Sequence, residues 1–401
     1  FFPEIRVLKK KNYFKIINFR MSSSSLSGNN ASNSEQSLTS FSQTSNKYGQ
    51  NDSNEESKDT GNSSVVENHY NSIEEKGLGH RNQSTILYLR NFNNWVKSML
   101  IDEYLSTITA NKKHGQPVKV LDLCCGKGGD LLKWKKGNVS HVICADIAGN
   151  AVADCQKRHE DLKAKNKYMF SGEFIVADCT RVLLRTKYKD PTILFDLVSC
   201  QFSFHYCFES LTQAETMLHN VSDCLRPGGY FIGTIPNAVD IVGRKRKARQ
   251  NWFGNRVFTI TFDEDLPEPY PLFGAKYNFH LHEVVDCPEY LVHFPTLERL
   301  AAKFGLKLIK RARFQNYYEE MKRKGESLLQ HMSALETYPP VNAKLVGPRS
   351  DYSDAKEYFR EYPGQKLIGT LSKSEWEVCT IYTMFAFQKV NPGETINVKS
   401  K

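Results

Sequence analysis

Residues 118–130 restrict the fold of this chain more than any other segment, with the sequence Val-Lys-Val-Leu-Asp-Leu-Cys-Cys-Gly-Lys-Gly-Gly-Asp. An apolar strand there runs into a glycine-containing turn, and a helix is predicted to follow. Units of this kind build open α/β sheets, and glycine lets a ligand approach the turn backbone and the first helical amides. The segment therefore predicts an α/β sheet that binds a ligand at the carboxyl ends of its strands, although such a turn also occurs without a ligand.

Two carboxylates indicate what this ligand is. Asp122 ends the first strand, and Asp146 ends the next strand 24 positions later, about the spacing that places a carboxylate on a ribose. The phosphate-binding G-x-G-x-x-G pattern is absent, and Asp122 would repel a pyrophosphate. An adenosine without phosphates fits better, so we expect a site for S-adenosylmethionine (AdoMet).

Strand and helix patterns alternate along the chain. Predicted strands are 118–123, 141–146, 173–177, 194–199 and 229–235, and predicted helices are 128–136, 149–165 and 210–226. This alternation favours a parallel sheet with right-handed crossovers. Residues 85–105 have helical periodicity ahead of it. The later expectations are a strand at 258–262, a helix at 295–304, a strand at 307–314, a charged helix at 315–335, an irregular segment at 336–375 and a last core strand at 376–388.

The first 80 residues are expected to lie outside the globular unit. Residues 21–80 are rich in Ser, Asn and acidic groups and poor in large apolar side chains, so they are predicted to be disordered. Residues 1–20 precede the first methionine, Met21, and are given no function. The expected boundaries are therefore a disordered segment at 1–80, a domain at 81–392 and a tail at 393–401.

The net charge of +10 belongs to the globular part. Residues 1–20 carry six basic and one acidic side chains, and residues 21–80 carry three basic and eight acidic ones. Their charges cancel, which leaves +10 on residues 81–401. A charge of this size favours a polyanionic partner such as RNA, although many basic domains bind none.

The ten cysteines are scattered, without a C-x2-C pair or a Cys/His cluster. This spacing predicts reduced thiols in the cytosol or nucleus and no metal site. No run of 18 apolar residues and no secretory signal pattern occurs, so no membrane span is expected.

Polar residues end four of the predicted strands. In an open α/β sheet these ends meet at one crevice, which would bring together Asp122, Asp146, Asp178 and Gln201. Each aspartate alone is more often a turn or cap residue, but their succession favours a binding site.

Several motifs together resemble the eukaryotic mRNA cap guanine-N7 methyltransferase family. They are Lys127-Gly-Gly-Asp-Leu-Leu-Lys-Trp134, Ser199-Cys-Gln-Phe, His205-Tyr-Cys-Phe-Glu-Ser210, Pro227-Gly-Gly-Tyr-Phe-Ile-Gly-Thr234, Pro288-Glu-Tyr290 and Gly369-Thr-Leu-Ser-Lys-Ser-Glu-Trp376. The likeness covers residues 84–390. It implies the class I Rossmann-like methyltransferase fold, a seven-stranded, mostly parallel sheet flanked by helices, with cap-binding insertions after strand 5.

The resemblance also implies two sets of site residues. The AdoMet set is Lys97 at the carboxylate, Asp122 at the amino group, Asp146 at the ribose, Asp178 at the adenine, Gln201 and Tyr206 at the sulfonium, and Cys124 and Gly126 in the turn. The cap set is Asn93 and Asn94 on the first helix, Lys127, Lys133 and Arg158 at the triphosphate, and Phe202, His205, Glu289 and Tyr382 around the guanine. Cys124 departs from the family, which usually has glycine at this position.

The implied reaction moves the methyl group of AdoMet to N7 of the terminal guanine of capped RNA. Guanine N7 has an in-plane lone pair, so an in-line displacement needs positioning and electrostatics but no general base. His205, Tyr206 and Glu289 are therefore expected to position the reactants and not to act as acid or base. Glu289 can accept hydrogen bonds from the N1 and N2 protons of guanine, which adenine cannot offer.

Two alternatives stay open at this point: a catalytically idle RNA-binding relative, and a class I methyltransferase for a small metabolite. The expected partners are the capped RNA 5′ end and, beyond it, the capping enzyme, the RNA polymerase II tail or an activating subunit. A nuclear location and a monomeric state are expected.

Overall fold

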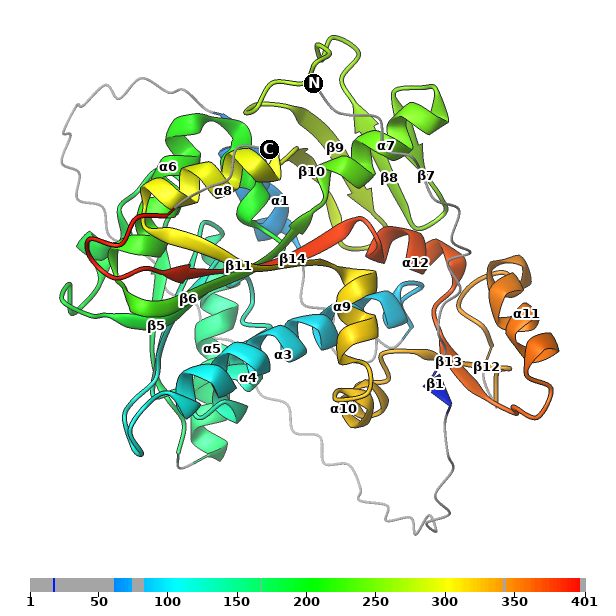
Figure 1. Ribbon diagram of the computed structural model, residues 1–401, viewed down its shortest axis with the longest axis horizontal. Helices are drawn as coiled ribbons and strands as arrows, with labels where there is room; N and C mark the ends of the chain where they lie inside the picture. Colours follow the sequence, from blue (N-terminus) through cyan, green and yellow to red (C-terminus); the bar gives the residue numbers. More distant parts are fainter. Residues whose placement is uncertain (1–16, 19–60, 74–82, 167, 342–343, 397–401) are drawn as a thin grey trace, which may run out of the picture.

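The computed structural model describes residues 61–73, 83–166, 168–341 and 344–396, together with the backbone of residues 17–18 (Figure 1). Its main sheet has seven strands. Their order is β11 (Leu306–Arg313), β14 (Tyr382–Lys389), β6 (Leu225–Pro236), β5 (Phe195–Gln201), β2 (Lys119–Leu123), β3 (His141–Asp146) and β4 (Ser171–Val176). Strands β6, β5, β2, β3 and β4 are parallel, and β14 is antiparallel to both β6 and β11. The predicted seven-stranded, mostly parallel sheet is confirmed.

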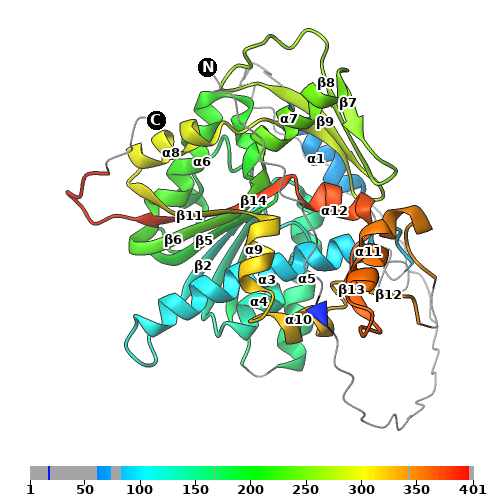
Figure 2. The ribbon, with the colours of Figure 1, turned by 45° about the vertical axis from the view of Figure 1, so that its right-hand side comes forward.

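Both faces of this sheet are covered by helices (Figure 2). Along β2, Val120 packs into one core while Leu121 and Leu123 pack into the other, because successive side chains of a strand point to opposite faces. The first core holds side chains of α3 (Leu87–Ala110), α4 (Leu131–Lys136) and α5 (Gly149–Lys165), and the second holds those of α6 (Leu211–Asp223) and α8 (Phe294–Lys303). The central parallel strands β2, β3 and β5 are therefore buried almost throughout.

An antiparallel sheet is inserted between β6 and α8. After α7 (Ala238–Ala248), the strands β7 (Trp252–Gly254), β8 (Phe258–Phe262), β9 (Lys276–Leu281) and β10 (Val285–Tyr290) pair in the order β10-β9-β8-β7. Its alternating strand β8 buries Phe258, Ile260 and Phe262. The predicted strand at 258–262 is present. The predicted insertion after the fifth predicted strand, at 229–235, is also present, because that strand lies within β6.

The single helix expected at 315–335 is wrong, because this segment forms α9 (Phe314–Met321) and α10 (Glu326–His331). Gly325 lies at the break. A Cβ atom at Gly325 would lie 2.7 Å from Trp95 Cζ2, and the Trp95 indole donates a hydrogen bond to the Gly325 carbonyl at 3.1 Å. The tight contact with α3 thus fixes a turn where sequence periodicity alone predicted a continuous helix.

The boundaries expected in residues 336–388 also need correction. The segment expected to be irregular contains β12 (Glu336–Tyr338), η3 (Arg349–Tyr352), α11 (Ser353–Glu361) and β13 (Ile368–Thr370). The last strand begins at Tyr382 and not at Trp376, because α12 (Lys373–Cys379) precedes it. A capping box starts α12, in which the Ser372 hydroxyl accepts from the Glu375 amide and the Glu375 carboxylate accepts from the Ser372 amide. β13 pairs with β12 and with β1 (Ile17–Asn18) in a small sheet.

The expected disorder of residues 21–80 is wrong for residues 63–72, which form α1 (Ser63–Ser72). Val66 of α1 is buried, and the helix packs on β10 and α5. The rest of residues 21–80 lies outside the described part of the chain, except residues 61, 62 and 73. The assignments for residues 1–20 and 397–401 also lie outside it, except for the backbone of residues 17–18.

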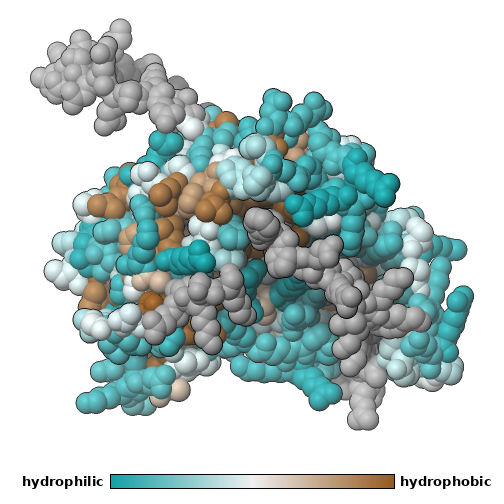
Figure 3. All heavy atoms as spheres, turned by 45° about the horizontal axis from the view of Figure 1, so that its top comes forward, coloured by the Kyte–Doolittle hydropathy of each residue, from teal (hydrophilic) through white to brown (hydrophobic). Residues whose placement is uncertain are grey.

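The face of the molecule in Figure 3 is mostly hydrophilic, with hydrophobic residues gathered on part of it. Exposed large apolar side chains such as Leu132 and Trp252 come from separate elements. Within the described residues, no helix is long and apolar enough to cross a membrane.

Candidate active site

A cavity of about 340 Å³ lies at the carboxyl ends of the parallel strands. Its wall includes the turn after β2, the end of β3, the segment after β4, and the end of β5 with the following η2 (Phe204–Glu209). Helix α1 closes it from the remaining side, with Val66 and Tyr70 in the wall. The predicted residues in this wall are Cys124, Gly126, Lys127, Asp146, Asp178, Gln201, Phe202 and Tyr206.

The turn after β2 has a left-handed backbone at three positions. Cys124, Gly126 and Gly128 have φ angles of 55°, 50° and 73°. Glycine adopts this conformation without strain, whereas a side chain at Cys124 is disfavoured. The Gly126 amide donates to Asp146 Oδ2 at 2.8 Å, so the turn is braced against the end of β3.

Asp146 is buried at the cavity wall and accepts two backbone hydrogen bonds. Besides the bond from Gly126, the Ala148 amide donates to Oδ1 at 2.9 Å. Burial raises the pKa of Asp146 to about 7, and the thiol of Cys124 acts in the same direction, while the two amides oppose it. Each carboxylate oxygen keeps a lone pair, which is suited to a ribose hydroxyl.

Asp178 follows β4 and has one unused acceptor. Its Oδ1 accepts from the amide and hydroxyl of Thr180, at 2.8 and 2.6 Å. Its Oδ2 is buried without a hydrogen-bond donor among the described residues, and the nearest cation, Arg181 Nε, is 3.5 Å away. A buried acceptor in the cavity wall fits the exocyclic amine of an adenine.

Lys97 and Asp122 do not belong to the described cavity wall. Lys97 Nζ pairs with Asp130 Oδ1 at 2.9 Å, and the Trp134 indole donates to Asp122 Oδ2 at 3.0 Å. Burial raises the pKa of Asp122 well above its ordinary value, and the charge of Asp130 adds to this effect. Burial has the same tendency at Asp130, but there Lys97 and Lys133 prevail and lower its pKa to about 2. These ion pairs and the indole hydrogen bond lie outside the described cavity wall and hold the turn and α4 in place.

A second polar group lies beside the cavity, where His205 and Glu289 are both buried. His205 Nε2 is 3.2 Å from Glu289 Oε1, without hydrogen-bond geometry, and neither ring nitrogen has a hydrogen-bond partner among the described residues. The Tyr277 hydroxyl donates to Glu289 Oε2 at 2.7 Å. The His205 ring is 4.5 Å from that of Tyr206, a residue of the cavity wall. The pair therefore adjoins the cavity.

Aromatic rings surround this region. Phe202, in the cavity wall, has its ring 5.0 Å from that of Tyr382, which begins β14. Phe202 is left-handed, with a φ angle of 61°. Tyr382 is buried between Phe202 and Phe314, whose ring is 5.6 Å away. Burial raises the pKa of Tyr382 well above its ordinary value, so its hydroxyl stays neutral.

The other residues expected to bind the cap, of which Lys127, Lys133 and Arg158 are expected at the triphosphate, come from α3, the turn after β2, α4 and α5. Lys127 Nζ donates to the Ile73 carbonyl at 2.7 Å and pairs with Asp154 at 3.0 Å. Lys133 Nζ pairs with Asp130 at 2.7 Å and donates to Asn94 Oδ1 at 2.5 Å. Arg158 lies on α5, and Asn93 Oδ1 is 3.9 Å from Cys379 Sγ. Of this set, only Lys127 reaches the described cavity wall.

Helix α1 and the preceding Asn62 cover one side of the cavity and are called its roof. This roof was not predicted. The Asn62 amide donates to Glu209 Oε1 at 2.9 Å, and its side-chain amide donates to the Tyr290 hydroxyl. Tyr70 points toward Tyr206, with 3.3 Å between the hydroxyl oxygens. The available signal was the Val66 and Tyr70 pair, four residues apart and therefore on one helix face, in a segment whose average composition is polar.

The sheet order, the braced turn and the acidic strand ends around a cavity without a pyrophosphate motif define a class I AdoMet-dependent methyltransferase. The chain also matches a sequence model of the mRNA (guanine-N(7))-methyltransferase domain over residues 53–390. It belongs to this family.

Relatives across eukaryotes agree with this assignment. The chain is 50% identical over 335 residues to the mRNA cap guanine-N(7) methyltransferase of Drosophila melanogaster, covering 82% of this chain and 77% of that protein. It is 41% identical over 337 residues to the Caenorhabditis elegans protein of the same name, covering 82% and 87%. Among solved structures, an S-adenosylmethionine-dependent methyltransferase from Clostridium acetobutylicum is 10% identical with a TM-score of 0.41, covering 75% of this chain and 92% of that one.

Proposed function

We propose that this chain transfers the methyl group of AdoMet to N7 of the terminal guanine of capped RNA, which converts GpppN ends into m7GpppN ends. The observation that carries the proposal is the buried pair of His205 and Glu289 beside the cavity. Buried polar groups are normally hydrogen-bonded; neither ring nitrogen of His205 has a hydrogen bond among the described residues, which favours a polar ligand beside this pair. A guanine there would lie next to the methyl donor across Tyr206.

Glu289 gives the site its preference for guanine. Its carboxylate can accept from the N1 and N2 protons, and its negative charge stabilises the positive charge that N7 methylation places on the ring. His205 contacts the base and positions it. Phe202 and Tyr382 supply aromatic walls against which a purine packs.

Methyl transfer then requires alignment more than proton chemistry. The N7 lone pair forms the new N–C bond as the S–C bond of the sulfonium breaks, and the bonding electrons go to sulfur. No proton leaves the nucleophile, so no general base is needed. Tyr206, whose pKa burial raises well above its ordinary value, stays neutral and positions the reacting groups.

We assign AdoMet to the cavity. Asp146 would hold the ribose hydroxyls, Asp178 the adenine amine, and Gln201 and Tyr206 the sulfonium end, with Cys124 and Gly126 against the methionine part. Lys97 and Asp122 are proposed to support the turn from outside the cavity wall. Lys97 Nζ would lie 3.8 Å from a Cβ atom built at Gly129. Their direct contact with AdoMet remains a prediction, as do the cap-binding roles of Asn93 and Asn94 and the cap-phosphate roles of Lys127, Lys133 and Arg158.

The functional unit is proposed to begin with α1 and not at residue 81. Its support is the roof that α1 forms over the cavity and the start of the family match at residue 53. The end of the unit near residue 392 and the short tail after it are kept as predicted.

The two alternative functions are less well supported. An idle relative would not need an AdoMet cavity with a buried His205–Glu289 pair beside it, and the charge of +10 on residues 81–401 favours a polyanionic substrate over a small neutral metabolite. We further propose a nuclear location, action as a monomer, and recruitment by the capping enzyme, the RNA polymerase II tail or an activating subunit.

A methyl-transfer assay tests the central proposal. Labelled AdoMet is supplied with GpppRNA, ApppRNA or free GTP, and the product is digested and identified. Label on N7 of the terminal guanine of GpppRNA, with little on ApppRNA, is expected. Equal labelling of ApppRNA, or labelling of internal positions only, would refute it.

A further inference from the structure

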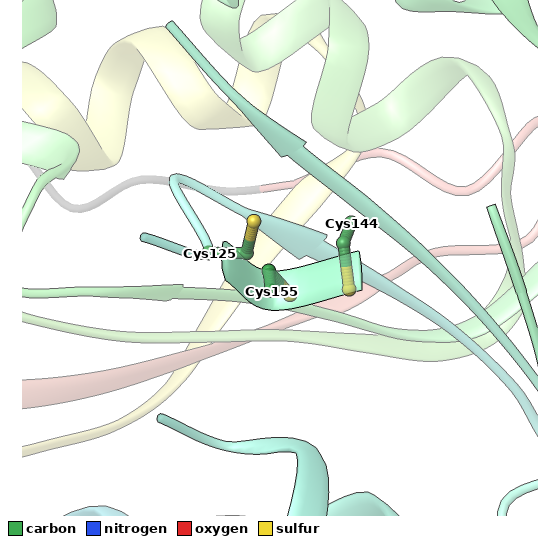
Figure 4. A group of neighbouring side chains, drawn as sticks. All are labelled: Cys125, Cys144 and Cys155. Carbon is green, nitrogen blue, oxygen red and sulfur yellow. The ribbon is translucent and has the colours of Figure 1, made fainter. Parts of the chain in front are cut away.

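Three cysteines from separate elements, Cys125, Cys144 and Cys155, lie close together (Figure 4). Cys125 follows β2, Cys144 lies in β3 and Cys155 lies in α5, and the three Sγ atoms are all within 4.8 Å of one another. Cys144 and Cys155 are buried, and Cys125 is half-buried. The cysteines are 19 and 11 positions apart in the chain, so their sequence spacing gave no sign that the fold brings them together.

The geometry is close to that of a three-thiolate metal site. With a metal–sulfur distance of about 2.3 Å, three sulfurs lie about 4.0 Å apart around a planar centre and about 3.8 Å apart around a tetrahedral one. The sulfur atoms would need to approach by at most about 1 Å to reach these values. No carboxylate or imidazole belongs to the group. Thiolates alone select soft ions, Cu⁺ or Zn²⁺, over Mg²⁺ or Ca²⁺.

We propose that Cys125, Cys144 and Cys155 form a binding site for one thiophilic metal ion, Cu⁺ or Zn²⁺, and that its occupation weakens AdoMet binding. Metal–sulfur bonds would form as the thiol protons leave to solvent. Cys125 gives the ion access, because it is the half-exposed member. A three-coordinate Cu⁺ would need no further ligand, and Zn²⁺ would take a water on the Cys125 side as its fourth.

Coupling to AdoMet follows from the positions of the three cysteines. Cys125 lies between Cys124 and Gly126, which both line the cavity, and Cys144 precedes Asp146 by two residues. A Cβ at Gly128 would lie 2.8 Å from Cys155 Sγ, so the turn rests directly on this sulfur. Drawing the sulfurs together would shift the turn away from the geometry that braces Asp146. We expect AdoMet affinity to fall at least about fivefold, and by linkage AdoMet weakens metal binding by the same factor.

The first test measures bound metal on the full, reduced, metal-free chain. Zn²⁺ and Cu⁺ are added separately, with Mg²⁺ as the hard-ion control, and metal per chain is determined by mass spectrometry after desalting. One Zn²⁺ or Cu⁺ and no Mg²⁺ is expected. Cys125→Ser and Cys155→Ala should lose the ion, whereas Cys224→Ser, at the far end of α6, should keep it. Retention in Cys125→Ser, a one-atom change, or loss in Cys224→Ser, would overturn the site.

The second test measures AdoMet binding by calorimetry with and without the metal. The affinity of the unmodified chain should fall at least fivefold when metal is bound, and that of Cys125→Ser should not respond to metal. Bound metal with unchanged AdoMet affinity would overturn the coupling. Neither measurement uses capped RNA, so both outcomes are independent of the proposed RNA substrate.

Discussion

Replacing Cys124 by glycine and by alanine separates two effects of this side chain at the AdoMet cavity. Its φ angle of 55° lies in the left-handed region, where a residue with a Cβ costs about 1–2 kcal/mol relative to the right-handed region. The side chain also lines the cavity and packs against the core formed with α6 and α8. A glycine at this position would adopt the same turn without this strain.

The two variants have different expected stabilities. Cys124→Gly removes the strain and loses the packing of the side chain, so its free energy of unfolding should stay within about 1 kcal/mol of the unmodified chain. Cys124→Ala loses the thiol but keeps the strained Cβ, and should be about 1 kcal/mol less stable than Cys124→Gly. For a folded unit the size of the matched residues 53–390, that difference corresponds to about 1–2 °C in Tm.

AdoMet affinity is the second measurement, by calorimetry on the same samples. Because the glycine variant widens the cavity next to the bound methionine part, its affinity should be equal to or better than that of the unmodified chain, with alanine between them. Equal Tm values for the two variants would refute the strain. A clear loss of AdoMet affinity in Cys124→Gly at unchanged Tm would mean that the thiol itself contacts the ligand.

Three further predictions concern the two binding regions and the roof. Glu289→Gln should lower activity on capped RNA by about 10- to 150-fold, the loss of one charged hydrogen bond of about 1.5–3 kcal/mol, while AdoMet affinity measured by calorimetry stays near normal; equal loss of both would contradict guanine recognition. AdoMet affinity should rise with pH by up to about tenfold per unit below pH 7 and then level off, because burial raises the Asp146 pKa to about 7 in the free chain and ribose hydroxyls favour its charged form; Asp146→Asn should abolish this dependence in the same titration. Val66→Ala should speed AdoMet dissociation about fivefold in stopped-flow measurements, since about 1 kcal/mol of roof packing is lost, whereas the exposed neighbour changed in Val65→Ala should leave the rate unaltered.

The central strands β2, β3 and β5 could be predicted because nearly all of their residues are buried and each strand ends at a polar residue or a turn. The same pattern located Asp146, Asp178 and Gln201 at one cavity. It could not locate the roof, because α1 is a short polar helix that is held mainly by contacts with residues far away in the sequence, such as Glu209 and Tyr290. Average composition over residues 21–80 hides a helix of ten residues that buries only Val66.

Errors in the second half of the chain have a similar origin. A charged periodic segment is split at Gly325 because Trp95, 230 residues earlier, needs the space of a side chain there. The start of the last strand is displaced to Tyr382 because Ser372 and Glu375 cap a short helix first. The spacing of apolar residues shows which face of a helix or strand a residue occupies. It does not show which distant side chain packs against that face.

The cations around the turn differ in how readily a phosphate could recruit them. Lys127 is 22% exposed and its partner Asp154 is 39% exposed, and a pair exposed to this extent contributes only about 0–1 kcal/mol. Lys133 and Asp130 are 10% and 8% exposed, and Lys133 also holds Asn94. Moving Lys133 away would leave Lys97 as the cationic partner of the buried Asp130, and removing one partner of a buried ion pair costs up to about 3–5 kcal/mol. If the predicted cap-phosphate site is correct, Lys127 would exchange Asp154 for a phosphate at little cost, whereas Lys133 would contribute mainly by keeping the turn and α3 in place.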